Sequence, residues 1–463
     1  MVYVGLVGAP LVGLVMVLRS GPAFEFSRPV HDAYNADSVP SVGAGVPNLA
    51  LLIAQIGLII ACSRALGFLA ERIRQPRVIG EMLAGIMLGP SLLGWVAPGL
   101  SSFLFPPASF TVLNALSQLG LALFMFMVGL ELNWNEVRRN GGISILIGHA
   151  SIAVPIALGT ILALVLYPQL SDRRVGFTEF ALFIGLGLSV TAFPVLARIL
   201  SERKLLRTRV GAVALACAAV VDITGWCLLA YIVAIVRASD SAFRVWTPIC
   251  GLLVFVAIMF FGVRPLLRKA EFAYRLDGEL SENWQALLLL LILISALATE
   301  SLGLHVLFGA FVAGVVMPKG HDFVSYVAGK FESLTVLLLL PLFFAYSGLR
   351  TRLGQVNGFR MWWLWLLIVF AAVVGKVAGT CLAARIGGLP WRESAALGVL
   401  MNTRGVMELA ILNIGLDIGV ISRPMFSMMV LMAVVTTMMT RPLLDWVFPS
   451  SLNECPMTTV SRD

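Results

Sequence analysis

The chain has 463 residues, of which 59% are hydrophobic and 13% are charged. Soluble domains contain roughly 45–50% apolar and about 25% charged residues, so this composition excludes a water-soluble enzyme, a disordered chain and a disulfide-stapled secreted domain. The net charge of +8 does not indicate nucleic-acid binding, because the basic residues lie in short loops between apolar runs. The sequence therefore predicts an all-α polytopic membrane protein.

The first apolar run, residues 2–18, is followed by its first cation, Arg19, and has no basic residue before it. A signal peptide instead carries its basic residues before the apolar region. We expect one additional, loosely held helix here, and the alternative is a cleaved or mis-started leader. Residues 19–47 are polar and contain prolines, which predicts an extramembrane linker. Residues 1–47 are thus an N-terminal apolar segment and linker that precede the membrane domain.

A membrane-spanning helix needs about 20 mostly apolar residues. Thirteen such stretches predict one transmembrane domain over residues 48–447, followed by a short tail, residues 448–463. The predicted spans lie near residues 48–69, 76–97, 111–132, 142–166, 178–200, 208–236, 245–263, 283–300, 303–317, 331–348, 361–384, 391–415 and 421–447.

The loops between these spans differ in charge. One alternating set contains 17 lysines and arginines and the other contains nine. Because cytoplasmic loops carry the excess of basic residues, the first set and the C-terminal tail are predicted to be cytoplasmic, in a multi-pass protein of the inner (plasma) membrane. The first set comprises residues 70–77, 133–141, 201–209, 264–282, 318–330 and 385–392.

Two spans are interrupted by proline or polar residues. The fifth contains Ser189 to Pro194, and the twelfth contains Asn402, Thr403, Arg404 and Gly405. A helix break inside the bilayer leaves free amides and carbonyls that only protein or a water-filled cavity can satisfy. The two spans are seven apart, so they cross in opposite directions. Such pairs indicate inverted repeats and a midplane site, as in secondary transporters.

Asp222 is the principal candidate site residue, because residues 212–236 contain no other charge. A charge at the bilayer centre costs about 2.5–3.5 kcal/mol on insertion scales, so such a residue usually faces a cavity and has a function. A carboxylate can hold either a proton or a cation, which is the minimum that exchange requires. The structural alternative is a protonated aspartic acid that is bonded to a neighbouring helix.

Other charges also lie within spans. Lys376, in the middle of its span, either pairs with a carboxylate or loses its proton, and the alternative is a snorkelling side chain. Arg404 and Glu408 are spaced i, i+4 and can neutralise each other, as a structural pair or as part of the ion pathway. Glu81 and Glu131 lie nearer helix ends and are more typical of solvated or gate-lining residues.

Six motifs occur in order along the chain: Met82–Gly94, Phe126–Glu131, Ser189–Val195, Ala218–Trp226, Gly375–Lys376 and Asn402–Gly405. Together they resemble the monovalent cation–proton antiporters, in the branch that includes bacterial K⁺ or Na⁺ exchangers and plant cation/proton exchangers. The resemblance covers residues 48–447, which is essentially the whole membrane part.

The resemblance implies two helix bundles, namely a panel that forms a homodimer and a core that contains the crossed broken helices, working by an elevator-type cycle. By position, Asp222 binds a monovalent cation and a proton in competition. Thr191 and nearby backbone would help to coordinate the ion, with Lys376 opposite. Arg404 would belong to the second crossing helix, with Pro194 marking the break in the first.

One position departs from the family pattern. Relatives usually carry an acidic or amide residue just before the key aspartate, and here that residue is Val221. In Asp-Asp relatives the preceding acid pairs with the lysine, so Lys376 lacks its usual partner. Either a glutamate replaces it or the lysine is neutral for part of the time. The candidate glutamates are Glu81, Glu131 and Glu408. With one intramembrane aspartate, we hypothesise electroneutral one-for-one exchange.

We therefore expect a secondary antiporter that exchanges K⁺ or Na⁺ for protons, and not an enzyme. The sequence contains no Walker A motif, no HExxH and no paired Cys/His spacing, so neither ATP nor an organic cofactor is expected. Its partners would be the cation, the proton, the lipid bilayer and a second copy, without nucleic acid. The alternatives are a sodium-coupled symporter or channel on a similar frame, and a transport-inactive membrane sensor.

Overall fold

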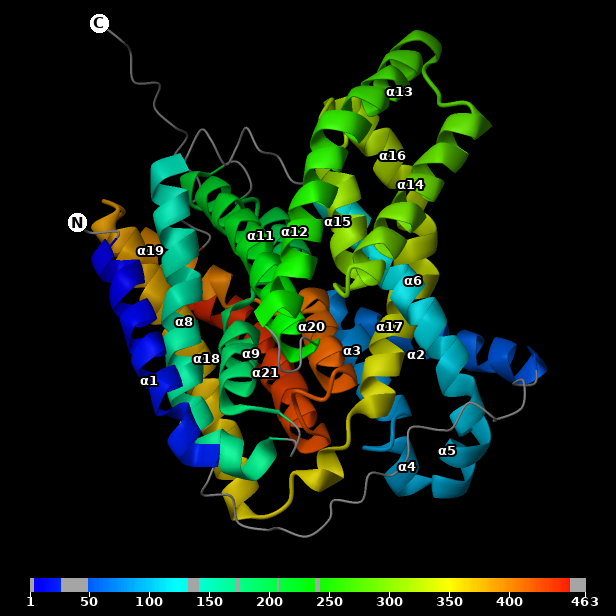
Figure 1. The fold of residues 1–463 in the computed structure, drawn as a ribbon. Helices are drawn as coiled ribbons and strands as arrows, with labels where there is room; N and C mark the ends of the chain where they lie inside the picture. The colour runs from blue at the N-terminus through cyan, green and yellow to red at the C-terminus, as the bar shows by residue number, and fades with distance from the viewer. Residues whose placement is uncertain are drawn as a thin grey trace, which may run out of the picture.

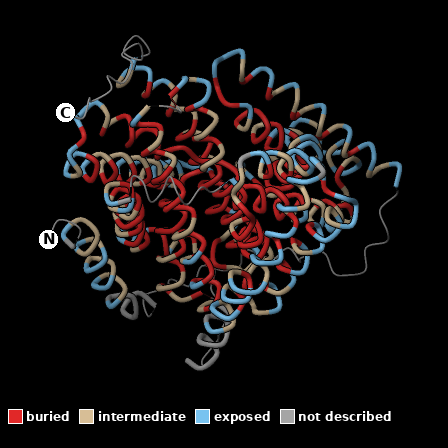
Figure 2. The backbone as a smooth tube through the Cα atoms, turned by 90° about the horizontal axis from the view of Figure 1, so that it is seen from above, coloured by how far each residue is buried: buried red, intermediate tan, exposed pale blue. Residues whose placement is uncertain are grey.

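The computed structural model describes residues 4–25, 49–131, 141–171, 175–205, 208–237 and 242–449, and these ranges contain helices and no strand. The helices form one bundle whose interior is buried and whose outer turns are exposed (Figures 1 and 2). Large apolar side chains lie on that outer surface, among them Leu290, Leu293 and Leu297 of one helix. An apolar exterior of this kind is suited to lipid, which agrees with the predicted membrane protein.

Among the described residues, eleven helices are long and apolar enough to cross a membrane, and one bent pair adds a twelfth. The span expected at residues 303–317 is the helix α15 (Val306–Val316), which has only 11 residues. At 1.5 Å per residue it is about 16 Å long, against about 30 Å for the hydrocarbon core. It begins late because Gly303 adopts a left-handed φ of 79°. The predicted count of thirteen is therefore not confirmed, whereas the all-α polytopic fold is.

The N-terminal apolar stretch is helical, and the helix continues to Glu25, into the predicted linker of residues 19–47. A π-helical turn, Val4–Gly8, leads into α1 (Ala9–Glu25). This helix lies along α8 (Gly141–Leu170) and α9 (Phe177–Ser189) (Figure 1). The linker prediction falls largely on residues 26–48, and the tail prediction on residues 450–463, which are outside the described residues.

The first group of helices, which we call the panel, occupies the right of Figure 1. Its helices approach closely through glycines. A Cβ on Gly348 would lie 2.0 Å from the carbonyl carbon of Gly85, so only glycine fits at this crossing. The panel comprises α2 (Leu49–Arg72), α3 (Arg77–Leu88), α4 (Leu93–Val96), α5 (Pro98–Leu104), α6 (Pro107–Glu131), α12 (Ala242–Ala257), α13 (Arg264–Asp277), α14 (Glu282–Ser301), α15, α16 (His321–Leu334) and α17 (Leu340–Arg350).

The second group, the core bundle, contains both interrupted spans. It repeats one pattern twice, a long helix followed by a broken helix and another long helix. The first repeat is α8 (Gly141–Leu170), α9 (Phe177–Ser189) with α10 (Phe193–Glu202), and α11 (Arg209–Arg237). The second is α18 (Phe359–Ile386), α19 (Trp391–Met401) with α20 (Val406–Asp417), and α21 (Arg423–Val447).

Both predicted breaks are confirmed. Residues 190–192 separate α9 from α10, and Pro194 lies in the first turn of α10. The amides of a first turn have no acceptor within the helix, so proline, which lacks the N–H, costs no helical hydrogen bond there. Four residues separate α19 from α20, which are bent by 44°. The breaks touch each other, because the amide of Ala192 donates to the carbonyl oxygen of Thr403 at 2.9 Å. A Cβ on Gly405 would lie 2.9 Å from Val195 Cγ2, so a larger residue here would press on the Val195 side chain.

Candidate functional site

Asp222 lies on α11, which packs against α9, α10 and α19 and therefore against both broken helices. Its side chain is 2% exposed, and its Oδ1 atom has no hydrogen-bond partner. A buried carboxyl with an unsatisfied oxygen is costly unless a cation or a proton satisfies it. This arrangement is the one that exchange of a cation for a proton needs.

Lys376 on α18 is fully buried and interacts electrostatically with Asp222. Its Nζ atom donates to the hydroxyl of Ser151 at 2.9 Å and to the carbonyl oxygen of Ser151 at 3.0 Å, and its third acceptor is the carbonyl oxygen of Ser189. Among the described residues it forms no ion pair with a carboxylate. Its partners are therefore neutral oxygens from α8 and from the end of α9.

Arg404, in the second break, also bonds to the end of α9. Its Nη1 and Nη2 atoms donate to the carbonyl oxygens of Gly187 and Leu188, both at 2.6 Å. The last carbonyls of a helix lack intrahelical partners and carry the negative end of its dipole. Arg404 and Lys376 together occupy the carbonyls of residues 187–189, so the C-terminus of α9 is capped by two cations.

Glu408 does pair with Arg404 as the spacing predicted, with Nη1 and Oε2 3.2 Å apart and both side chains fully buried. The backbone of Arg404 is fixed as well, since its amide donates to Thr437 Oγ1 at 2.9 Å and its carbonyl accepts from the same hydroxyl at 3.0 Å. Thr437 lies on α21. The arginine is thus held at both its side chain and its backbone.

The remaining residues of the two breaks are also buried. The Oγ1 atom of Thr191 donates to the carbonyl oxygen of Met401 at 2.9 Å, which ties the first break to the end of α19. Thr403 Oγ1 donates to Leu400 at 3.0 Å. Asn402 is 1% exposed, and both polar atoms of its side chain are buried without a partner. Asn402 therefore offers an unused amide oxygen beside the crossing.

Two candidate glutamates lie elsewhere. Glu131 is the last residue of α6 in the panel, next to carbonyls of Gly129 and Leu130 that both accept from Lys319 at 2.9 Å. Glu81 is buried on α3 and lines a cavity of about 200 Å³ together with Arg64 and other residues of α2 and α3. Neither contacts Lys376 in the described part of the chain, so the missing carboxylate partner is not supplied by these two residues.

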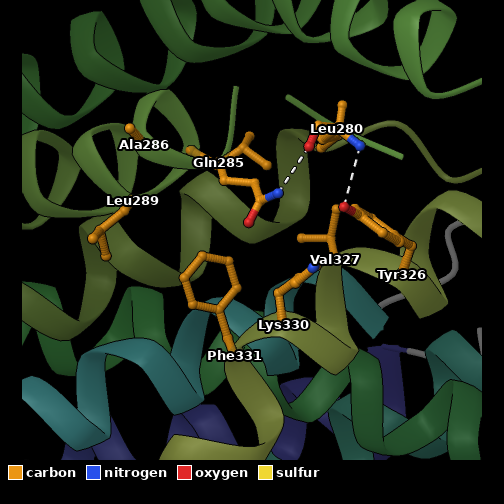
Figure 3. Close-up of a pocket in the computed structure, with 9 residues that line it drawn as sticks. Leu280, Gln285, Ala286, Leu289, Tyr326, Val327, Lys330 and Phe331 are labelled. Carbon is orange, nitrogen blue, oxygen red and sulfur yellow. Dashed lines mark hydrogen bonds between the residues drawn. The ribbon is translucent and has the colours of Figure 1, made fainter. Parts of the chain in front are cut away.

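A second cavity, of about 270 Å³, lies in the panel between α14 and α16 (Figure 3). Leu280 lines this cavity and bonds to two other lining residues. Its amide donates to Tyr326 Oη at 3.1 Å, and its carbonyl oxygen accepts from Gln285 Nε2 at 2.8 Å. Lys330 and Phe331 of α16 also line the cavity. Its lining contains no residue of the core bundle, so this cavity is separate from the buried charges around Asp222.

In the part of the chain that the structure describes, two ion pairs join the panel to the core bundle at helix ends. Glu71 of α2 pairs with Arg198 of α10 at 2.7 Å. Arg350 of α17 pairs with Asp417 of α20 at 2.6 Å. Under the predicted topology the first pair is at the cytoplasmic face and the second at the opposite face.

The sequence did not single out Ser151, because an isolated serine in an apolar run is unremarkable. One signal did point to its neighbourhood, namely the glycines that flank Lys376. A Cβ on Gly375 would lie 3.1 Å from Pro155 Cα, and one on Gly379 would lie 2.9 Å from Val154 Cβ. These glycines bring α18 close to α8, and this contact places Lys376 against Ser151.

Residues 57–446 match the family described as "Sodium/hydrogen exchanger, transmembrane". The chain is 42% identical over 403 residues to the Na⁺/H⁺ antiporter NhaS4 of Synechocystis, which covers 87% of this chain and 98% of that relative. It is 41% identical to cation/H⁺ antiporter 17 of Arabidopsis thaliana and 35% identical to K⁺/H⁺ antiporter 1 of Saccharomyces cerevisiae, over 86% and 88% of this chain. It spans about half the length of these two relatives, 48% and 47%.

The fold has a solved counterpart. The sodium proton antiporter MjNhaP1 of Methanocaldococcus jannaschii superposes with a TM-score of 0.59 at 16% sequence identity, over 88% of this chain and 97% of that structure. At this identity the likeness establishes the fold alone.

Proposed function

The chain belongs to the sodium/hydrogen exchanger family, and from that premise we propose that it exchanges a monovalent cation, K⁺ or Na⁺, for protons across a membrane. The observation that carries the proposal is the buried carboxyl of Asp222, which has an unpartnered oxygen and belongs to a helix that packs against both broken helices. Relatives named for Na⁺ and for K⁺ leave both ions as candidates.

The proposed cation ligands follow from which oxygens are free. The carbonyls at the end of α9 are occupied by Arg404 and Lys376, so they are not available to the ion. Thr191 uses its hydroxyl hydrogen on Met401, which leaves the lone pairs of its oxygen for a cation. The proposed set is the carboxylate of Asp222, the hydroxyl of Thr191 and the amide oxygen of Asn402.

The balance of charges supports one-for-one, electroneutral exchange. Arg404 and Glu408 neutralise each other, which leaves Lys376 and Asp222 as the remaining charged groups of the cluster. Whether Asp222 holds a monovalent cation or a proton, the cluster then carries the same net charge. The membrane potential therefore does not favour one loaded form over the other.

The proposed movement is of the elevator type. Asp222, Lys376 and both breaks belong to the core bundle, so this group can carry the ion as a unit relative to the panel. The pairs Glu71–Arg198 and Arg350–Asp417 join the two groups at opposite faces, and sliding the core bundle breaks at least one of them. Each is a partly exposed pair, typically worth about 0.2–1 kcal/mol, which a transport cycle can break readily.

The orientation and assembly are part of the same proposal. The excess of lysine and arginine in one set of loops supports a plasma-membrane protein with a cytoplasmic C-terminus. The panel, whose outer face presents apolar side chains of α14, would form the contact in a homodimer.

The proposal is tested in inverted vesicles with a pH-gradient dye, to which KCl, NaCl or choline chloride is added in turn. Dequenching with K⁺ or Na⁺ and not with choline is expected, without net current. No dequenching at any pH, from protein shown to be folded, contradicts antiport and favours the sensor. A current that follows turnover contradicts the one-for-one stoichiometry alone.

A further inference from the structure

Lys376 has no carboxylate partner on the neighbouring position of α11, because Val221 offers neither charge nor ligand. A buried ammonium left without acceptors would turn towards the nearest carboxylate, since an unpaired buried charge costs several kcal/mol in typical proteins. Among the described residues, the carboxylates that interact electrostatically with Lys376 are Asp222 and Glu408, and Glu408 is already paired with Arg404. The acceptors that hold the Lys376 ammonium therefore decide whether the carboxylate of Asp222 is available to another cation.

Three oxygens hold it. An ammonium has three N–H donors, and Lys376 has three acceptors, which are Ser151 Oγ at 2.9 Å, Ser151 O at 3.0 Å and Ser189 O. Two of the three are backbone carbonyls and stay in place whatever the side chains are. The hydroxyl of Ser151 is the one acceptor that the amino-acid sequence specifies.

The position of this hydroxyl is fixed by packing. Ser151 is buried on α8, and α18 approaches α8 through Gly375 and Gly379 on either side of Lys376. The third acceptor, Ser189, ends α9, where two further carbonyls are occupied by Arg404. The ammonium is thus tied to α8 and α9 rather than to α11.

We propose that Ser151 is a positioning residue for the exchange reaction, which takes the place of the missing carboxylate and holds the ammonium of Lys376 away from Asp222. This inference rests on the proposed antiport. With the ammonium held by neutral oxygens, the carboxylate of Asp222 is open to the transported cation. Without the hydroxyl, one N–H of Lys376 is released and bonds to Asp222, where it competes with the cation.

The test is the variant Ser151→Ala in proteoliposomes, with exchange measured over a range of K⁺ or Na⁺ concentrations. A hydrogen bond to a charged group is worth enough to change an equilibrium by at least about tenfold. We therefore expect the apparent KM for the cation to rise by about tenfold, with a much smaller change in the maximal rate. Ser151→Thr, which keeps the hydroxyl, should restore the KM of the wild type.

A matched control is Ser144→Ala. Ser144 is seven residues earlier on α8 and equally buried, and it is not among the acceptors of Lys376, so the loss of its hydroxyl should leave KM unchanged. A second measurement is the midpoint of thermal stabilisation by KCl or NaCl in detergent, which reports cation binding without turnover. It should shift to higher concentration in Ser151→Ala only.

The outcomes separate the two claims. If the wild type exchanges cations and Ser151→Ala has the wild-type KM and stabilisation midpoint, the positioning role is wrong and antiport stands. A fall in maximal rate with unchanged KM means a purely structural serine and also overturns the inference. If the wild type itself shows no cation-dependent exchange, the proposed function is wrong, and the inference that rests on it is overturned with it.

Discussion

Arg404 and Leu188 lie on different broken helices, and the Nη2 atom of Arg404 donates to the carbonyl oxygen of Leu188 at 2.6 Å. Arg404, in the break between α19 and α20, thus caps the C-terminus of α9. Because Ala192 and Thr403 are also bonded backbone to backbone, the two breaks form one unit. A rigid crossing explains how a polar, irregular backbone is tolerated at this depth, since its free groups are satisfied within the protein.

The first prediction concerns the buried pair. Arg404→Ala removes two bonds to α9 and leaves Glu408 as an uncompensated buried charge, so the free energy of unfolding should fall by about 3–5 kcal/mol. Thermal unfolding in detergent measures the change. Arg404→Ala combined with Glu408→Ala removes both charges and should be more stable than Arg404→Ala alone. Equal stability of the single and double variants would show that burial of Glu408 is not the cause.

The second prediction concerns the movement of the core bundle. Cysteines in place of Glu71 and Arg198, joined by a short thiol cross-linker, connect the panel to the core bundle. If exchange requires the two groups to slide, the cross-link should reduce exchange at least about tenfold, and cleavage of the linker should restore it. Dye dequenching before and after cleavage provides the measurement.

The matched control places cysteines at Glu202 and Arg441, which also pair at a helix end, at 3.2 Å. Both belong to the core bundle, on α10 and α21, so a cross-link there leaves sliding possible and exchange intact. Exchange that survives the first cross-link, or is lost equally with the second, would contradict an elevator movement.

The third prediction concerns pH. If one carboxyl, that of Asp222, binds the cation and the proton in turn, acid conditions fill it with protons and the cation must displace them. The apparent KM for the cation should then rise as pH falls, by up to about tenfold per pH unit once the carboxyl is mostly protonated, while the maximal rate at saturating cation changes little. Initial rates at several pH values and cation concentrations check this. A KM that is independent of pH would mean that the two ions bind at different groups.

Features that depend on local sequence were predictable. Pro194 and the polar residues Asn402 to Gly405 located both breaks, because proline and polar groups disrupt helices in an apolar environment. Asp222 was identified because it is isolated in an apolar run, and the structure buries it on α11, which packs against both broken helices. The spacing of Arg404 and Glu408 predicted their ion pair.

Features that depend on tertiary packing were not predictable. The partner of Lys376 is a serine 225 residues away on another helix, and nothing in the pattern of charges indicates it. The same holds for Thr437, which fixes the backbone of Arg404 from α21. Residues 303–317 were predicted as a full span because the stretch is apolar from Gly303 onward. In the structure α15 begins only at Val306, because the backbone at Gly303 is left-handed.

The central claim is that Asp222 is the exchanging group, and Asp222→Asn tests it most directly. The amide keeps the size of the side chain but cannot take up a proton or neutralise a cation. Asp445→Asn, at a partly exposed ion pair with Arg203, serves as the matched control. We predict that Asp222→Asn folds with wild-type thermal stability or better and gives no dequenching with K⁺ or Na⁺, whereas Asp445→Asn exchanges normally. Full exchange by folded Asp222→Asn would contradict the account.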